Sequence, residues 1–184
     1  MNIDLAHRLK SALTARGEEL FASCGDAAPE VLQALLRNPA LAENHLLALL
    51  ERRELPEELL AAISRHPLAG ESHRVKVALV HHPNTPGPQL LALLPHLYLF
   101  ELVTVCYLPG TTPDQRVAAE RAIIQRLPTT QLGNKLTLAR RGTGAIVEAL
   151  LKEADPRLLA ACLDNPHLKE GMVFQFLSGR WATA

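Results

Sequence analysis

Five histidines lie close together in the middle of the chain, and they are the residues whose type best suits metal chemistry. They are His66, His73, His81, His82 and His96. A zinc site would place two of them on one helical face or in a His-Glu-x-x-His arrangement, and neither pattern occurs cleanly. His66 and His82 each precede a proline, where an imidazole can bond the last carbonyls of a helix. We therefore interpret these histidines as helix caps and predict no metal site and no cofactor.

Sequence patterns typical of enzymes are missing. The chain has no G-x-S-x-G motif, no Gly-rich phosphate loop and no cysteine with a recognisable histidine partner. Its three cysteines, Cys24, Cys106 and Cys162, are odd in number and far apart. Such cysteines are typical of a reducing compartment. We predict a cytoplasmic protein that is not an enzyme and has no catalytic residues.

A short repeat is the most informative feature of the sequence. "ALLRNPALAENHLLALL" (34–50) and "ACLDNPHLKEGMVFQFL" (161–177) share Ala, Leu, Asn, Pro, Leu, Glu and a final Leu at matching positions. A third stretch, "ALVHHPNTPGPQLLALL" (78–94), matches the first at its proline and along its apolar tail. The corresponding turn residues are Pro39, Pro67, Pro83, Pro109, Gly142 and Pro166. Self-similarity of this kind indicates a repeat architecture with a loose period.

Each copy predicts one helix that stops at a proline and another that starts shortly afterwards. Thr112 and Pro113 suit the start of a helix, and Gln115 lies at capping-box spacing from Thr112. Thr85–Pro86 and Asp155–Pro156 predict two further starts. The low aromatic content of 4% and the abundance of Leu and Ala also favour helices. We predict an all-α fold of about twelve short helices, stacked as antiparallel pairs into an α-solenoid.

The length of 184 residues suits one domain with a substantial core. We predict a single repeat domain over residues 1–184. Residues 1–28 would be polar N-terminal capping helices, 29–178 the repeats and 179–184 a tail.

The pattern ALL-x-NP-x-L-x-E-x-x-LLALL resembles the bacterial leucine-rich repeat variant proteins and, more broadly, HEAT-like α-solenoids. The resemblance runs from about Pro29 to Leu177. It implies a right-handed superhelix of paired helices that serves as a binding platform. The leucine-rich repeat variant family is founded on a protein whose iron–sulfur cluster is held by a separate cysteine group. This chain has no such group, so the resemblance does not bring that cofactor with it.

The position two residues before each turn residue predicts a row of side chains along one edge of the superhelix. Its candidate partner-binding residues are Arg37, Arg65, His81, Tyr107 and Arg140, extended by Arg141. Guanidinium groups in such a row could bind acidic side chains or phosphates. The alternative is a solvated row that caps helices and keeps the protein soluble.

A second candidate is the apolar stretch "LYLFELVTVCYL" (97–108), which contains a single carboxylate. Tyr98, Phe100, Glu101 and Thr104 are the residues of a possible ligand groove. The alternative is that Glu101 faces solvent or pairs with an arginine of a neighbouring repeat.

Three functions remain open on the sequence alone. A protein–protein interaction scaffold fits the repeats and the net charge of zero. A HEAT-like nucleic-acid-binding protein, similar to a DNA-repair glycosylase, would use the arginines with Tyr98, Tyr107 or Trp181, but the net charge of zero counts against nucleic acid as a partner. A ligand or regulatory sensor would be built around Glu101. No segment is long and apolar enough to suggest a membrane partner, and the apolar C-terminal helix predicts a possible self-association.

Overall fold

The computed structural model describes residues 3–178, and over that range the chain is helical, with fourteen α-helices, two 3-10 helices and no strand. The all-α class predicted from the sequence is therefore confirmed. No helix of the described part of the chain is long and apolar enough to cross a membrane. The predicted tail at 179–184, with Trp181, lies outside the described residues. The chain divides into two compact units, Met1–Leu97 and Tyr98–Ala184, and the single repeat domain stays a prediction.

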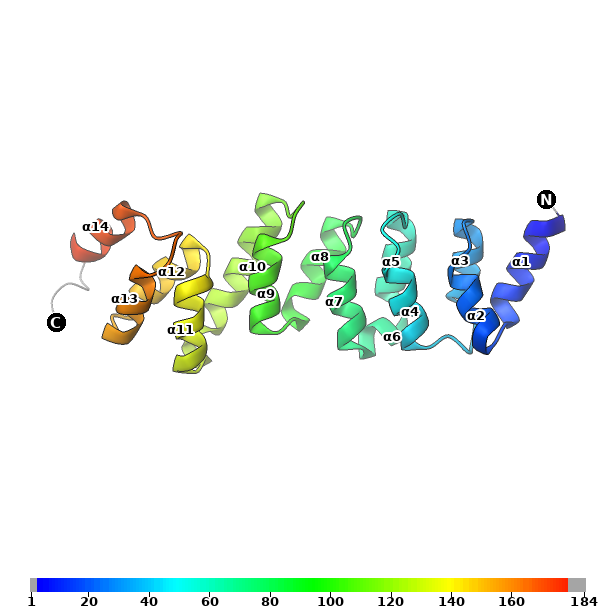
Figure 1. Ribbon diagram of the computed structural model, residues 1–184, viewed down its shortest axis with the longest axis horizontal. Coiled ribbons are helices and arrows are strands. Elements are labelled where there is room, and N and C mark those ends of the chain that lie inside the picture. The colour runs from blue at the N-terminus through cyan, green and yellow to red at the C-terminus, as the bar shows by residue number, and fades with distance from the viewer. Residues whose placement is uncertain (1–2, 179–184) are drawn as a thin grey trace. The chain divides into compact units, whose positions relative to one another are not determined.

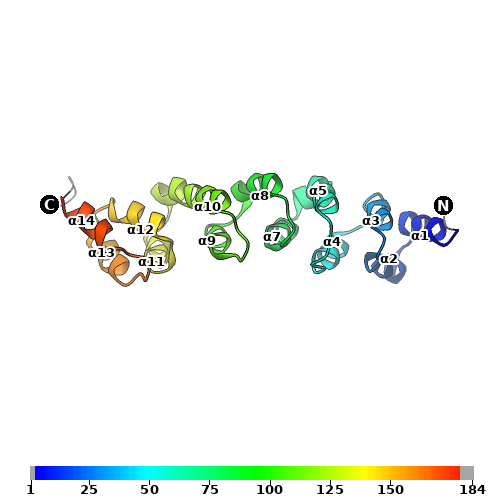
Figure 2. The ribbon, with the colours of Figure 1, turned by 90° about the horizontal axis from the view of Figure 1, so that it is seen from above.

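Unit 1 consists of two layers of short helices. Its elements are α1 (Ile3–Thr14), α2 (Gly17–Cys24), α3 (Pro29–Leu35), α4 (Glu43–Leu50), α5 (Glu57–Arg65), α6 (Pro67–Glu71), α7 (His73–His81), α8 (Gly87–Leu93) and the 3-10 helix η1 (Leu94–His96). In one layer α3 packs between α1 and α5, and in the other α4 packs between α2 and α7. Figure 2 shows these two rows and the return of the chain through α8 to the row of α1, α3 and α5.

Unit 2 repeats this two-layer arrangement. Its elements are α9 (Leu99–Tyr107), α10 (Pro113–Arg126), the 3-10 helix η2 (Leu127–Thr129), α11 (Leu132–Arg141), α12 (Gly144–Leu151), α13 (Pro156–Leu163) and α14 (Glu170–Ser178). Helices α10 and α12 contact each other in one layer, and α11 packs on α13 in the other (Figure 2). Both units are held by Leu, Val, Ile and Ala side chains that the alternating layers bury; Leu46, Leu59, Leu102 and Ile123 are fully buried. Each such burial contributes about 1.5–3 kcal/mol.

Most of the helix starts that were predicted at prolines are confirmed. Pro113 begins α10, the Thr112 hydroxyl accepts a hydrogen bond from the Gln115 backbone N–H, and the Gln115 side chain accepts one from the Thr112 N–H. The expectation that Thr85 caps α8 is wrong. Pro86 occupies the N-cap position, and the Thr85 hydroxyl instead donates to the carbonyl of Leu79 in α7. Thr85 therefore closes the helix before it, because its side chain is buried against that helix end.

The repeated asparagine ties one turn to the preceding parallel turn. The Asn38 Nδ2 donates to the carbonyls of Ala12 (2.8 Å) and Ala15 (3.0 Å), and its Oδ1 accepts from the Ala40 N–H (2.8 Å). The side chain bridges from the turn after α3 to the turn after α1. The Asn38 side chain is only 4% exposed, so water cannot take over these hydrogen bonds if the side chain is removed.

Asn165 makes the same three bonds in unit 2. Its Nδ2 donates to the carbonyls of Ala139 (2.7 Å) and Gly142 (3.0 Å), and its Oδ1 accepts from the His167 N–H (2.7 Å). The sequence separations of 26, 23 and 2 residues equal those at Asn38. The repeated residues therefore form the same hydrogen-bonded asparagine turn in both units.

His82 performs the same task with an imidazole. Its Nε2 lies 2.7 Å from the carbonyl of Arg52, and its Nδ1 accepts from the Asn84 N–H at 3.2 Å. Acceptance at Nδ1 requires the tautomer with hydrogen on Nε2, which donates to Arg52. His66 also accepts through Nδ1, from the Leu68 N–H, and so caps the start of α6. The prediction that both histidines cap the helix before them is corrected: His82 bonds the turn after α4, and His66 bonds the helix that comes next.

Candidate functional site

The predicted row of side chains does not follow one edge of unit 1. Arg37 and Arg65 are exposed just after α3 and at the end of α5, where Figure 1 shows the chain leaving both helices at the lower edge. His81 ends α7, whose following turn bonds the carbonyl of Arg52 after α4, at the upper edge (Figure 1). The structure thus brings Arg37 and Arg65 to one edge and places His81 at the opposite one.

In unit 2 the corresponding residues do come together, at the ends of α9, α11 and α13. The Tyr107 hydroxyl donates to the carbonyl of Arg141 at 3.1 Å, and its ring stacks on that of His167 at a centroid distance of 5.7 Å. Arg140 and Arg141 end α11 and are exposed. We call the group Tyr107, Arg140, Arg141 and His167 the arginine edge. Burial raises the pKa of Tyr107, with further increases from Cys106 and Glu120, so the hydroxyl remains a donor at neutral pH.

The predicted ligand residues at the start of α9 serve local structure. The Glu101 carboxylate accepts from the Tyr98 N–H at 2.7 Å and so caps its own helix. The Thr104 hydroxyl donates to the carbonyl of Phe100 at 3.0 Å. Tyr98 and Phe100 are 66% and 42% exposed, so neither ring encloses a pocket around the carboxylate. The geometry accounts for Glu101 as a helix cap.

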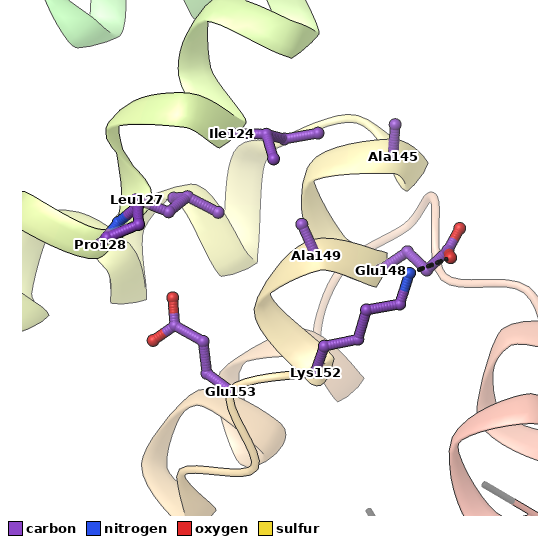
Figure 3. A pocket seen from close by; sticks show the side chains of 8 residues that line it. All are labelled: Ile124, Leu127, Pro128, Ala145, Glu148, Ala149, Lys152 and Glu153. Carbon is purple, nitrogen blue, oxygen red and sulfur yellow. Dashed lines mark hydrogen bonds and ion pairs between the residues drawn. The ribbon is translucent and has the colours of Figure 1, made fainter.

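A groove lies between α10 and α12 in unit 2. Its volume is about 490 Å³, and its lining residues are Ile124, Leu127, Pro128, Ala145, Glu148, Ala149, Lys152 and Glu153. Figure 3 shows Ile124 and Leu127 pointing from α10 and its end toward the two alanines of α12. We call this the α10–α12 groove. Its floor is apolar because the alanines, one helical turn apart, keep the α12 surface low.

The rim of the groove is charged but compensated. Lys152 Nζ lies 2.8 Å from Glu148 Oε1, as the dashed line in Figure 3 shows. Glu153 pairs with Lys135 at 2.7 Å, and the Lys135 side chain is only 13% exposed. Each carboxylate thus has an ammonium partner, and the rim presents no net charge to a ligand. Its chemistry suits an apolar group surrounded by polar contacts.

The cysteines do not act as nucleophiles at neutral pH. All three are buried free thiols. Burial raises the pKa of Cys162 to about 11, and burial followed by the nearby Glu120 raises the pKa of Cys106 to about 11. Burial also raises the pKa of Cys24. Since the thiolate is the reactive form, these side chains behave as small apolar core groups.

A metal site built from the histidines finds no support in the described residues. Over residues 3–178 no group of three or more His, Cys, Asp or Glu side chains could hold a metal ion. His45, which the sequence did not single out, is buried under Phe21 at a ring-centroid distance of 4.2 Å. Its Nδ1 accepts from the Ala42 N–H at 3.0 Å, which closes the start of α4. The spacing of three residues to the N-cap was the signal that could have revealed it.

Sequence reasoning also missed the α10–α12 groove. Ala145 and Ala149 are ordinary helix formers, and nothing in their sequence context indicates that Leu127 lies opposite them. The only signal was the pair of small residues one turn apart, followed by the charged residues 152 and 153.

The C-terminal helix α14 buries no side chain. Phe174 is 72% exposed and Leu177 is 60% exposed. The predicted self-association through this helix stays a prediction.

Comparison of the chain with protein-family models, with curated proteins and with solved structures gave no match. The functional argument therefore starts from the geometry of unit 2 and from the shared asparagine turns.

Proposed function

We propose that this chain is a non-enzymatic protein-interaction module and that its α10–α12 groove receives an apolar side chain of a partner polypeptide. The observation that carries the proposal is the groove itself, with an apolar floor and a rim whose ion pairs are internally compensated. Its lining residues are apolar except for Glu148, Lys152 and Glu153, and each of these three charged side chains is held in an ion pair. An apolar anchor in a shallow cleft, surrounded by polar contacts, is how many protein interfaces gain affinity.

The proposal includes the finer architecture, a right-handed α-solenoid of the leucine-rich repeat variant or HEAT-like type. Support comes from the equal bonding of Asn38 and Asn165, because a repeated turn that ties each helix to its predecessor builds an array of parallel neighbours. A cytoplasmic location is part of the same proposal. It is supported by the three cysteines, which are buried as unpaired thiols.

The test is a pull-down from lysate of the source cells with mass spectrometry, comparing the wild type with Ala145→Gln/Ala149→Gln. Glutamine preserves helix propensity and adds no charge, yet its side chain fills the floor of the groove. Ala160→Gln, at an exposed position of α13, is the matched control. We expect one protein to be retained by the wild type and the control and lost by the groove variant.

Two outcomes would contradict the proposal. Equal retention by all three forms would show that the groove is not the binding surface. Retention that disappears after nuclease treatment would show that nucleic acid, and not a protein, mediates the capture.

A further inference from the structure

Two neighbouring arginines, Arg140 and Arg141, end α11 in unit 2. Neither the Arg140 nor the Arg141 guanidinium has a hydrogen bond or ion pair within residues 3–178, although both are exposed at the end of the same helix. In the same unit the Arg157 guanidinium binds Asp155 at 2.8 Å. In unit 1 Arg8 binds Asp26 at 2.8 Å. Arg140 and Arg141 are therefore available to a ligand in a way that the paired arginines are not.

The surface beside these arginines is held in place before any ligand arrives. The hydrogen bond from Tyr107 to the Arg141 carbonyl joins the end of α9 to the end of α11. The Asn165 amide joins the turn after α13 to the same helix end through Ala139 and Gly142. The stacking of Tyr107 on His167 completes the link between the three turns. A surface that is already ordered loses little conformational freedom on binding.

The chemistry of this surface selects carboxylates on a polypeptide. Guanidinium groups bind carboxylates through paired, charge-assisted hydrogen bonds. Successive helical residues point about 100° apart, so Arg140 and Arg141 suit two separate carboxylates better than one compact anion. Tyr107 is 45% exposed and provides a flat amphipathic surface of the kind that peptides pack against.

A continuous polyanion fits this surface less well. Asp164 is exposed and precedes Asn165, whose amide binds the α11 end, so the turn that is tied to this helix end carries a carboxylate. Tight binding of nucleic acid requires several neutralised phosphates in succession, and a carboxylate in that path repels them. A peptide can place its acidic residues on the arginines and a neutral residue opposite Asp164.

We propose that the arginine edge binds an acidic polypeptide segment, with Arg140 and Arg141 each binding a carboxylate beside the Tyr107 ring. This inference rests on the proposed function as a protein-interaction module and names the chemistry of a partner segment. None of the residues that line the α10–α12 groove belongs to the arginine edge, so the two surfaces can be tested separately.

The experiment is a fluorescence-anisotropy titration of a fluorescein-labelled hexaglutamate peptide with the whole chain at about 0.15 M salt. We expect saturable binding by the wild type and at least about a tenfold loss of affinity in Arg140→Glu/Arg141→Glu, because two charge-assisted contacts become repulsive. Arg16→Glu/Arg53→Glu is the matched control, since it changes the same charge at two exposed positions of unit 1 that belong to neither candidate binding surface. The control should bind within about twofold of the wild type. Arg140→Gln/Arg141→Gln, which removes charge without reversing it, should also lose about tenfold and guards against misfolding of the first variant.

Three results would overturn the inference. The first is absence of binding by the wild type. The second is an equal loss in both charge-reversal variants, which would indicate an unspecific effect of net charge. The third is tighter binding of a single-stranded oligothymidylate than of the peptide, with loss in the same Arg140/Arg141 variants, which would assign the edge to nucleic acid. A negative peptide result with a groove-dependent pull-down would remove this inference and leave the proposed function standing, whereas the reverse pattern would remove the groove.

Discussion

The two copies of the asparagine turn share their bonds but differ in the helix that comes next. After Asn38 the chain forms α4, which buries His45, Leu46, Leu49 and Leu50. After Asn165 it forms α14, which buries none of its side chains. The final leucine of the repeat shows the difference most directly, because Leu50 is 7% exposed and Leu177 is 60% exposed.

This difference shows that the repeated residues determine the turn but not the burial of the helix that follows it. The asparagine finds its partners in the preceding turn, which the chain supplies in both units. The leucine needs a neighbour on its other side. Helix α4 has α2 and α7 as neighbours, whereas α14 leaves Phe174 and Leu177 exposed. The matched residues Leu50 and Leu177 therefore contribute different amounts to the free energy of unfolding.

The sharpest test is the same substitution at the two matched leucines. We expect Leu50→Ala to lower the free energy of unfolding by about 2–4 kcal/mol, because it opens a cavity in a packed core. Leu177→Ala should change it by less than about 0.5 kcal/mol, since that side chain is mostly exposed. Urea unfolding followed by circular dichroism measures both. A loss at Leu177 that grows with protein concentration would mean that a second copy covers α14, in line with the predicted self-association.

The next test asks whether the two asparagine turns are energetically equal. Asn38→Ala and Asn165→Ala should each lower the free energy of unfolding by about 2–4 kcal/mol, because each leaves buried carbonyls and one N–H without partners. Asn134→Ala, at an exposed position of α11, is the control and should be nearly neutral. A large effect at Asn38 with none at Asn165 would show that the turns share geometry but not importance.

Helix caps could be predicted from the sequence because the two partners of each cap lie within a few residues of each other. The start of α10 at Pro113 with its capping box is one example. The position of His81 could not be predicted in this way. The short helix α6 (Pro67–Glu71) comes between α5 and α7, and α7 then packs beside α4 in the other layer. The extra helix α6 thus places the end of α7 at the opposite edge. The spacing of the prolines does not show in which of the two layers α7 lies.

The candidate sites show the same distinction between features that depend on nearby residues and features that depend on distant ones. Tyr107, Arg140 and Arg141 were found from the repeat because each precedes or adjoins a turn. The stacking of Tyr107 on His167 could not be foreseen, since it joins positions sixty residues apart in the sequence through the packing of three helix ends. The α10–α12 groove was missed for the same reason: Leu127 and Ala149 line one groove only because the chain passes through α11 in the other layer and returns to place α12 against α10.

A smaller effect should show that His82 substitutes for an asparagine. His82→Asn should cost no more than about 1 kcal/mol, because an amide can donate to the Arg52 carbonyl and accept from the Asn84 N–H as the ring does. His82→Ala should cost about 2 kcal/mol, since it leaves both groups unpaired. Thermal and urea unfolding of the two variants provide the comparison. If asparagine and alanine cost the same, the ring contributes by filling space and not by bonding.

The smallest effect concerns the start of the helix that leads into each asparagine turn. Helix α13 has Asp155 as its N-cap, and the Asp155 carboxylate accepts from the Arg157 N–H at 2.8 Å. Helix α3 instead follows Ala28, which provides no side-chain cap. The hydrogen bond from the Arg157 side chain, followed by that from its backbone, lowers the pKa of Asp155 from 3.8 to about 2. A depressed pKa means that the charged cap stabilises α13 above about pH 4 and loses this effect as the pH falls through about 2.

NMR titration of the Asp155 carboxyl carbon measures this difference. In Arg157→Ala the pKa should return toward 3.8, because the main partner of the carboxylate is gone. Arg121→Ala, an exposed arginine of α10, should leave the Asp155 titration unchanged. Because the ion pair is exposed, its effect on global stability should be small, and the start of α3 should show no corresponding titration at Ala28. An unchanged Asp155 pKa in Arg157→Ala would assign the shift to the backbone N–H and the helix dipole, and the two helix starts would then differ by the cap alone.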